Sequence, residues 1–224
     1  MARIVVVGAS QGGVRALHAL VAALPLEFTA PLLIVQHIGA SPSILPSILT
    51  KADTRTAAFG QHGERLQEGR IYIAPPDHHM LLRDGTLQLT RGPRENWARP
   101  AVDPLFRSAA HYYGPDVIGI VLSGRLNDGT SGLYEIKRHG GIAIVQTPGE
   151  AEVDEMPQSA LDNVAVDYCL RVAEMPRLLA RLTHESGAAQ FWERAADEAE
   201  HQEGAVSQLV EAGWAHPEAG VQGG

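Results

Sequence analysis

A serine set between glycines is the first feature of this sequence that could do chemistry. Gly8, Ser10 and Gly12 have the Gly-x-Ser-x-Gly spacing of a nucleophile elbow, in which a tight turn exposes the serine hydroxyl. Because serine is a poor nucleophile without a base, His37, which follows the second apolar run, is its natural partner. Asp128 follows a later apolar run and supplies a carboxylate that could orient the imidazole. The three residue types together predict acyl transfer through a Ser-His-Asp triad.

Each of these residues also has a plain structural interpretation. The glycine turn could cradle a phosphate at a helix N-terminus, or it could only turn the chain. His37 alone could be a strand-end histidine bonded to backbone, and Asp128 alone could cap the helix that follows it. A dinucleotide site is disfavoured, because the spacing is not Gly-x-Gly-x-x-Gly and no acidic residue ends the second strand. The chain order Ser-His-Asp differs from that of the α/β-hydrolases, which argues against that fold.

A metal site is disfavoured as well. His78 and His79 adjoin Asp77, but neighbouring histidines in a strand point to opposite faces and seldom chelate together. The single cysteine, Cys169, excludes an intrachain disulfide and a cysteine-based zinc or iron–sulfur site. Residues 94–99 form a basic loop that we expect to be solvated, although one of its arginines could orient a polar substrate. We therefore expect a reaction that needs neither a metal nor another cofactor.

The elements that must position these side chains alternate between strand and helix. Continuous apolar runs predict buried strands at residues 4–8, 32–35, 71–74, 117–122 and 142–146. The spacing of apolar residues predicts helices at residues 14–24, 103–113 and 172–182, and Ser41-Pro42 is typical of a further helix start. Residues 80–82 and 86–90 flank Asp84-Gly85, which predicts an antiparallel hairpin.

The expected fold class is α/β, with a doubly wound, mostly parallel sheet flanked by helices and an antiparallel hairpin insertion. Open sheets of this kind place their sites at the carboxyl ends of the strands. Ser10 and His37 each follow a strand closely, and Asp128 lies a few residues beyond another. We therefore expect the three side chains to meet at one edge of the sheet.

Composition predicts one packed domain with an acidic appendage. The chain has 224 residues, of which 45% are hydrophobic and 20% are charged. No apolar run approaches the ~20 residues of a membrane span, and the first residues lack the features of a signal peptide, so we expect a cytoplasmic protein without membrane insertion. The segment from Thr183 onward contains eight acidic residues and one basic residue, Arg194, and the rest of the chain is nearly neutral in net charge. Without a basic stripe, we expect no nucleic-acid partner.

Several motifs occur in order along the chain and together resemble a known family. The motifs are Gly8-Ala9-Ser10-Gln11-Gly12-Gly13, Val35-Gln36-His37, Gly69-Arg70-Ile71-Tyr72-Ile73-Ala74-Pro75, Arg99-Pro100-Ala101-Val102-Asp103-Pro104-Leu105-Phe106, Asn127-Asp128-Gly129-Thr130-Ser131-Gly132, Gly140-Gly141, Gln146 and Met156-Pro157. This ordered set resembles the catalytic domain of the chemotaxis protein-glutamate methylesterases, the CheB family, over roughly residues 4–182. The resemblance implies a CheB-type catalytic domain at residues 1–182, which leaves an acidic Ala/Glu/Gly-rich tail at residues 183–224. The tail could be a pair of docking helices or a solvated extension.

The resemblance implies a serine hydrolase that removes methyl groups from glutamate methyl esters in the cytoplasmic region of chemoreceptors, and that can deamidate receptor glutamines. By the same resemblance Ser10 would be the nucleophile, His37 the general base and acid, and Asp128 the residue that orients the imidazole. Backbone amides at the Ser10–Gln11 turn, on a helix N-terminus, are candidates to hold the oxyanion. The residues expected to line the oxyanion or substrate site are Gln11, Gly12, Arg125 and Met156.

The sequence departs from the family pattern at several positions. The family has Gly-Met-Gly where this chain has Gly124-Arg125-Leu126, so Arg125 would place a positive charge beside the substrate. Leu126 would be strained by roughly 1–2 kcal/mol if the glycine it replaces needs a positive φ. Glu155 replaces a glycine, and Gln11 stands where a small hydroxyl residue is common.

The family's N-terminal receiver domain has no counterpart ahead of Ile4, where the first strand begins. We therefore expect a standalone member, or the catalytic piece of a longer one, without control by phosphorylation in the same chain. The departures leave an alternative open, in which a substrate-shifted or non-catalytic signalling module of the same fold binds a partner.

Overall fold

The computed structural model describes residues 3–50 and 55–184, and its main element is one seven-stranded parallel sheet. In order across the sheet, the strands are β3 (Ala57–Phe59), β4 (Ile71–Ile73), β2 (Leu32–Gln36), β1 (Ile4–Ala9), β7 (Val117–Val121), β8 (Ile142–Gln146) and β9 (Tyr168–Leu170). Every neighbouring pair is parallel. A separate antiparallel hairpin joins β5 (His79–Arg83) to β6 (Thr86–Thr90).

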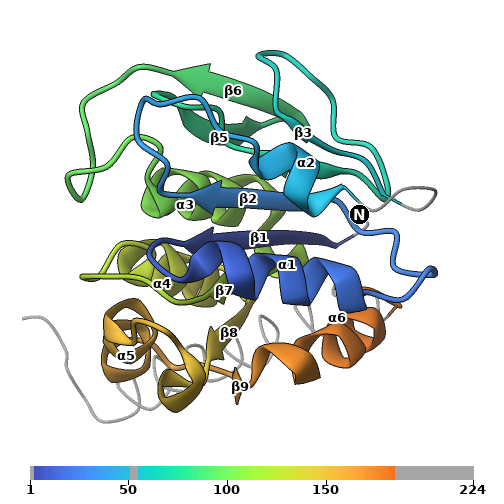
Figure 1. The fold of residues 1–224 in the computed structure, drawn as a ribbon. Coiled ribbons are helices and arrows are strands. Elements are labelled where there is room, and N and C mark those ends of the chain that lie inside the picture. Colours follow the sequence, from blue (N-terminus) through green and yellow to red (C-terminus); the bar gives the residue numbers. More distant parts are fainter. Residues whose placement is uncertain (1–2, 51–54, 185–224) are drawn as a thin grey trace, which may run out of the picture. The chain divides into compact units, whose positions relative to one another are not determined.

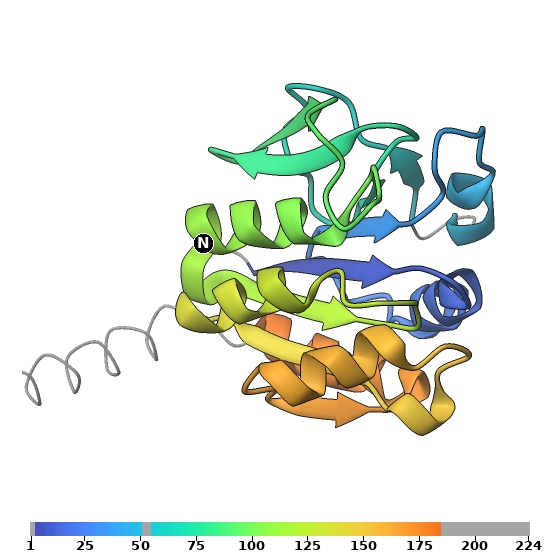
Figure 2. The same ribbon diagram turned by 90° about the vertical axis from the view of Figure 1, so that its left-hand side faces the viewer.

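Helices cover both faces of this sheet, as expected for a doubly wound fold. The α-helices of the described residues are α1 (Gly13–Ala23), α2 (Leu45–Leu49), α3 (Val102–Tyr113), α4 (Thr130–Arg138), α5 (Glu155–Asn163) and α6 (Met175–His184). Short 3₁₀ turns occur at Gly114–Asp116, Pro148–Glu150 and Val172–Glu174. Figure 1 shows α1 and α6 in front of the sheet with α3 and α4 behind it, and Figures 1 and 2 both show the hairpin beyond the β3 end. The predicted fold class is confirmed.

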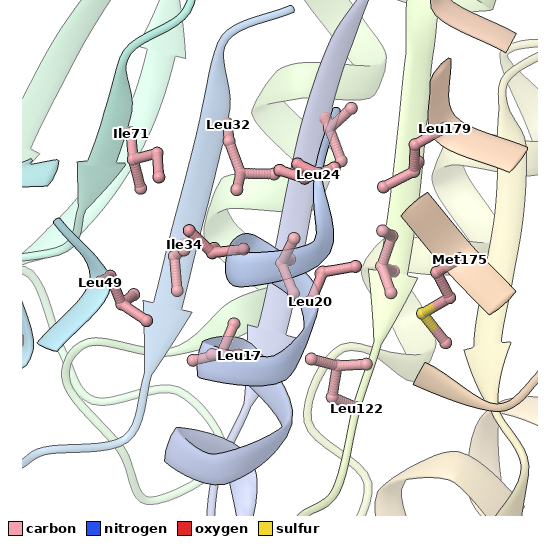
Figure 3. Packing of buried hydrophobic residues seen from close by; sticks show 14 of the residues in the cluster. Leu17, Leu20, Leu24, Leu32, Ile34, Leu49, Ile71, Leu122, Met175 and Leu179 are labelled. Carbon is pink, nitrogen blue, oxygen red and sulfur yellow. The ribbon is translucent and has the colours of Figure 1, made fainter. Parts of the chain in front are cut away.

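The central strands are buried on both sides, which explains why they read as unbroken apolar runs rather than as alternating ones. Val5 and Val7 of β1 belong to the core formed with α1, α2 and α6. Ile4 and Val6 belong to the second core, formed with α3, α4, α5 and the hairpin. Figure 3 shows part of the first core, in which Leu20 of α1 lies against the sheet.

Three short elements were not predicted from the sequence. Strands β3 and β9 have three residues each, too few for any period to be recognised. Helix α5 is polar over most of its length, with only Met156, Pro157 and Ala160 buried, so it has no strong apolar stripe.

The helix expected to start at Ser41-Pro42 begins instead at Leu45, so that prediction was wrong. Pro46 explains the difference, because a helix starting at Pro42 would hold Pro46 in its interior, where it lacks an N–H and clashes with the preceding turn. In α2, Pro46 lies in the first turn, where the missing N–H has no intrahelical partner to lose. The Ser43 hydroxyl oxygen accepts the N–H of Leu45 at 3.2 Å.

The centre of the sheet contains its topological switch. Strand β1 is followed in the chain by β2, its neighbour on one side within the sheet. The chain later returns to β7, the neighbour of β1 on the other side. Such a switch leaves a crevice at the carboxyl ends of the strands. The segments that follow β1, β2 and β7 carry Ser10, His37 and Asp128, and all three therefore lie at this crevice.

The described helices and the end of the described chain bear on two expectations from the sequence. Among the helices of residues 3–50 and 55–184, none is both long and apolar enough to cross a membrane. The acidic tail predicted from residue 183 lies outside the described residues, apart from Thr183 and His184, which end α6.

Leu20 offers a direct test of the core on the α1 side. Its side chain is fully buried, whereas Leu26 in the following loop is 67% exposed. We expect Leu20→Ala to lower the free energy of unfolding by about 3 kcal/mol, because it removes buried methyl groups and leaves a cavity. Leu26→Ala, the matched control, should change it by less than about 0.5 kcal/mol. Urea denaturation measures both, and equal effects at the two positions would contradict the packing described above.

Candidate active site

Three side chains form a continuous hydrogen-bonded chain at the carboxyl edge of the sheet. His37 Nδ1 lies 3.0 Å from Ser10 Oγ, and His37 Nε2 lies 2.7 Å from an oxygen of Asp128. Ser10 follows β1 directly, His37 follows β2 directly, and Asp128 stands in the loop between β7 and α4. The structure thus brings together the three residues that the sequence singled out separately.

The orientation of the His37 ring determines which nitrogen donates a hydrogen bond and which accepts one. A carboxylate only accepts hydrogen bonds, so Nε2 must carry the proton that is donated to Asp128. Nδ1 of the neutral ring is then the acceptor for the Ser10 hydroxyl. The Asp128 side chain is 2% exposed and the His37 side chain 19%, so solvent reaches the serine end of the chain and not the carboxylate end.

Asp128 is ionised despite its burial. Burial alone would raise the pKa of this carboxyl, but hydrogen bonds from His37, the Val102 N–H and Asn96 outweigh it and hold the pKa below its ordinary value. A carboxylate in this place keeps the imidazole in one tautomer and stabilises the imidazolium that forms when the ring takes a proton.

Asp128 caps a helix, but not the one that follows it in the chain. Its oxygens accept the backbone N–H groups of Val102 at 2.7 Å and Asp103 at 3.1 Å, the first two residues of α3. The start of α4 is capped instead by Asp103, whose Oδ1 accepts the N–H groups of Gly129 at 3.0 Å and Gly132 at 2.7 Å. The two aspartates therefore cap each other's helices. The interpretation of Asp128 as an ordinary cap of α4 was wrong.

The turn after the nucleophile has a defined peptide orientation. The Ser10 carbonyl accepts the Gly13 N–H at 2.9 Å and the Gln36 side-chain amide at 2.7 Å. In a trans peptide the carbonyl and the next N–H point in opposite directions, so the Gln11 N–H points away from Gln36. Within the described chain the N–H groups of Gln11 and Gly12 donate to no protein acceptor. These two amides, at the start of α1, are the candidate donors for an oxyanion.

The amide of Ser10 itself has to be removed from the expected oxyanion donors. It donates to the Ser123 carbonyl at 2.9 Å and so is not free. Gly12, the N-cap of α1, has a φ of 78°. A Cβ there would also come within 2.6 Å of both Ser123 Oγ and Glu152 Cβ, so only glycine fits this position.

The departures from the family pattern contact one another in pairs. Arg125 Nε donates to the Gln11 side-chain oxygen at 2.7 Å, and both side chains are exposed beside Ser10. The N–H of Leu126 donates to the Glu155 carboxylate at 2.8 Å. Leu126 has a φ of 63°, so the condition for strain at this position is met. The Glu155 hydrogen bond helps to hold Leu126 in that conformation.

Met156, which we expected to line the substrate site, is fully buried and lies beneath the active-site loop. A Cβ at Gly124 would overlap the Met156 sulfur and lie 2.7 Å from Ser10 Cβ, so the methionine packs against the loop close to the nucleophile. A side chain without exposed surface cannot touch a substrate in this conformation. Met156 is therefore corrected from a lining residue to a supporting one.

Three further candidates from the sequence, His78, His79 and Arg99, make other contacts. The ring nitrogens of His78 and His79 lie 2.8 Å from the Pro76 carbonyl and 2.9 Å from the Pro93 carbonyl, respectively. In the part of the chain that the structure describes, no group of three or more His, Cys, Asp or Glu residues could hold a metal ion. Arg99 binds Asp77 at 2.6 Å and lowers the pKa of that carboxyl, so it is not free to orient a substrate.

Sequence reasoning missed three residues that support the triad: Gln36, Asn96 and Asp103. Gln36 and Asp103 belong to motifs that were recognised, but a glutamine beside a histidine or an aspartate at a helix start carries no chemical signal by itself. Asn96 lies within the loop at residues 94–99, which we expected to be solvated. Its side-chain amide donates to Asp103 at 2.8 Å and to Asp128 at 2.7 Å.

Comparison with known proteins adds independent information. The family model described as CheB methylesterase matches residues 5–179. A putative protein-glutamate methylesterase/protein-glutamine glutaminase of Leptospira interrogans is 39% identical over 180 residues, which are 80% of this chain and 93% of that protein. A protein-glutamate methylesterase/protein-glutamine glutaminase 2 of Anaeromyxobacter dehalogenans is 40% identical over 80% of this chain and 53% of its own length. The crystal structure of the Thermotoga maritima CheB methylesterase catalytic domain matches with a TM-score of 0.76 and 33% identity, over 81% of this chain and 99% of that one.

Gln36 tests the orientation of the nucleophile turn. We expect Gln36→Leu to slow the labelling of Ser10 by a serine-directed fluorophosphonate by about tenfold or more, because loss of a whole oxyanion donor costs about 10²- to 10³-fold. Gln88→Leu is the matched control, since Gln88 lies on the hairpin and its side-chain amide donates to Thr86. Equal labelling rates in the two variants would mean that Gln36 does not orient the peptide between Ser10 and Gln11.

Proposed function

Because the chain belongs to the CheB methylesterase family, we propose that it is a serine hydrolase that removes methyl groups from glutamate methyl esters on chemoreceptors. The observation that carries the proposal is the unbroken chain from Ser10 through His37 to Asp128 at the carboxyl edge of the sheet. A role in chemotaxis signalling and a cytoplasmic location, where the methylated region of the receptor lies, are part of the same proposal.

The mechanism follows from the order of the three side chains. Ser10 Oγ attacks the carbonyl carbon of the ester while its proton passes to His37 Nδ1, and Asp128 stabilises the imidazolium through Nε2. The N–H groups of Gln11 and Gly12 receive the negative charge that develops on the carbonyl oxygen. The tetrahedral intermediate collapses as His37 returns its proton to the departing methoxide, which releases methanol and leaves an acyl-enzyme.

Water completes the reaction in the same way. His37 takes a proton from a water molecule, which attacks the acyl-enzyme, and the proton then returns to Ser10 as glutamate is released. The same steps on a glutamine side chain expel ammonia in place of methanol, so protein-glutamine deamidation belongs to the proposal. Deamidation agrees with the names of the relatives, which include both activities.

The alternative, a non-catalytic signalling module, is not favoured by this geometry. Binding a partner does not require a half-buried hydroxyl bonded to an imidazole that is itself bonded to a buried, ionised carboxylate. Such an arrangement costs desolvation of the carboxylate and is typical of a hydrolytic site.

Methanol release from methylated chemoreceptor membranes tests the proposal directly. We expect release by the unaltered protein, its loss on Ser10→Ala, and unchanged release on Ser131→Ala, which removes an exposed serine of α4. Removing the nucleophile should lower the rate by about 10⁶-fold. Absence of release from the unaltered protein, or equal release by Ser10→Ala, would contradict the assignment.

Arg125 is proposed to influence which methyl esters are preferred. Its Nε is bonded to Gln11, and the rest of the exposed guanidinium faces solvent beside Ser10. Arg125→Met should lower the preference for esters with acidic neighbours by on the order of fivefold, because an exposed ion pair contributes up to about 1 kcal/mol. Competition between peptide methyl esters with acidic and with neutral neighbours measures this preference. Arg83→Met on the hairpin is the control, and an unchanged ranking in Arg125→Met would contradict the role.

A further inference from the structure

Asn96 lies on a tight turn that directs its side chain inward. Glu95 and Ala98 exchange two backbone hydrogen bonds, of 3.2 and 2.8 Å, so Asn96 and Trp97 form a two-residue hairpin turn. Both have positive φ, of 47° and 62°, a combination found in type I′ turns, in which asparagine is favoured. Trp97 is 89% exposed, while the amide of Asn96 reaches the buried carboxylates beside His37.

Asp103 and Asp128 would repel each other without a hydrogen-bond donor between them. Taken as whole residues, both aspartates are buried, with 5% of Asp103 and 1% of Asp128 exposed, and both project into the space between α3 and α4. Burial raises the pKa of Asp103, and the negative charge of Asp128 raises it further. Two like charges in one buried site tend to share a proton unless donors keep both ionised.

The amide of Asn96 has two N–H groups, and each has a carboxylate to receive it. Nδ2 lies 2.8 Å from Asp103 Oδ2 and 2.7 Å from Asp128 Oδ1. The opposite amide orientation would set a carbonyl oxygen against two acceptors, so chemistry dictates the assignment of nitrogen and oxygen. Asn96 is thus the only side chain of the described residues that the hydrogen bonds join to both carboxylates.

We propose that Asn96 is a positioning residue, whose amide ties Asp103 to Asp128 and so holds the Asp128 carboxylate in place against His37 Nε2. The inference rests on the proposed function, because the reaction gives the alignment of His37 its purpose. Asn96 does not touch the reacting atoms and acts through Asp128.

The groups that face this pair come from each neighbouring element. The end of β2 contributes His37, α3 contributes Asp103 and Arg107, and the Asn96 turn contributes Glu95, which binds Arg107 at 2.6 Å. From the start of α4 only backbone N–H groups reach Asp103. Of the described residues, Arg107 is the cation that acts on Asp103, and it is already bonded to Glu95. Within this part of the chain, removal of the Asn96 amide therefore leaves Asp103 without a side-chain donor.

Loss of the Asn96 amide should change the pH dependence of activity in a predictable direction. With no bridge, a proton is taken up by the pair of carboxylates at a higher pH than before. Asp103, whose pKa is already raised, takes it first, and a protonated Asp103 that shares its proton with Asp128 weakens the charge that stabilises the imidazolium. Activity should therefore fall at neutral pH and fail on the acid side at a higher pH than in the unaltered protein. The alkaline side should keep its position, since no group that titrates there is changed.

The clean variant is Asn96→Gly, because glycine adopts the positive φ at this position without strain and removes only the amide. Asn96→Asp keeps the shape and replaces a double donor by a third carboxylate. Trp97→Gly is the matched control, since it alters the same turn at an exposed side chain with no bond to either carboxylate. The rate of Ser10 labelling by a fluorophosphonate is followed from acid to alkaline pH for each, together with thermal unfolding.

We expect labelling at neutral pH to slow by about 10- to 100-fold in Asn96→Gly and by more in Asn96→Asp, with the acid limb moved to higher pH in both. Trp97→Gly should keep the unaltered rate and pH profile. An unchanged rate and acid limb in Asn96→Gly would overturn the proposal, and so would an equal loss in Trp97→Gly, which would point to the turn rather than to the amide. Failure of the unaltered protein to label would instead count against the proposed function itself.

Discussion

One buried carboxylate joins the packing of this protein to its chemistry. Asp128 accepts the first two N–H groups of α3, the side-chain amide of Asn96 and the ring N–H of His37. These donors come from three parts of the chain, so the carboxylate fixes the start of α3, the turn at residues 95–98 and the end of β2 in one place. Four donors also offset the desolvation of the charge, which is why Asp128 stays ionised where an unpaired carboxylate would take up a proton.

This arrangement depends on helices that approach the sheet and each other very closely. A Cβ at Gly8 in β1 would overlap the Val102 side chain at the start of α3, and a Cβ at Gly132 in α4 would overlap Phe106 of α3. Glycine at both positions lets the α3 N-terminus lie directly over the nucleophile strand and against α4. The reciprocal caps by Asp103 and Asp128 then become geometrically possible. Packing and polar contacts therefore specify the same placement of α3.

Much of this could be predicted from the sequence, because its central features have local signals. The strands at the centre of the sheet are continuous apolar runs, and Ser10 and His37 directly follow two of them, so their meeting at one edge follows from parallel pairing. The hairpin was predicted from Asp84-Gly85, a turn signal that needs no tertiary context. The ordered family motifs predicted the family to which the chain belongs, together with its fold.

What could not be predicted depends on contacts across long stretches of sequence. Apart from His37, the donors to Asp128 come from residues that nothing in the sequence marks as polar partners. The role of Asn96 depends on a turn whose direction is set by the three-dimensional structure. Met156 was expected at the surface of the site, yet burial of its side chain is decided by how α5 packs, and α5 itself had no clear signal. The start of α2 was misplaced because Pro42 and Pro46 are both typical of a helix start. Only a helix that begins at Leu45 avoids placing Pro46 in its interior.

The central claim is that His37 is held in one tautomer between Asp128 and Ser10, and nuclear magnetic resonance of isotope-labelled histidine tests it most directly. In its neutral form the ring should carry its proton on Nε2, strongly deshielded by the bond to Asp128, and a bare Nδ1 should face the Ser10 hydroxyl. The Nε2 proton signal should be lost or should move upfield in Asp128→Asn. A ring that carries its proton on Nδ1, or one that exchanges freely between tautomers, would contradict the account.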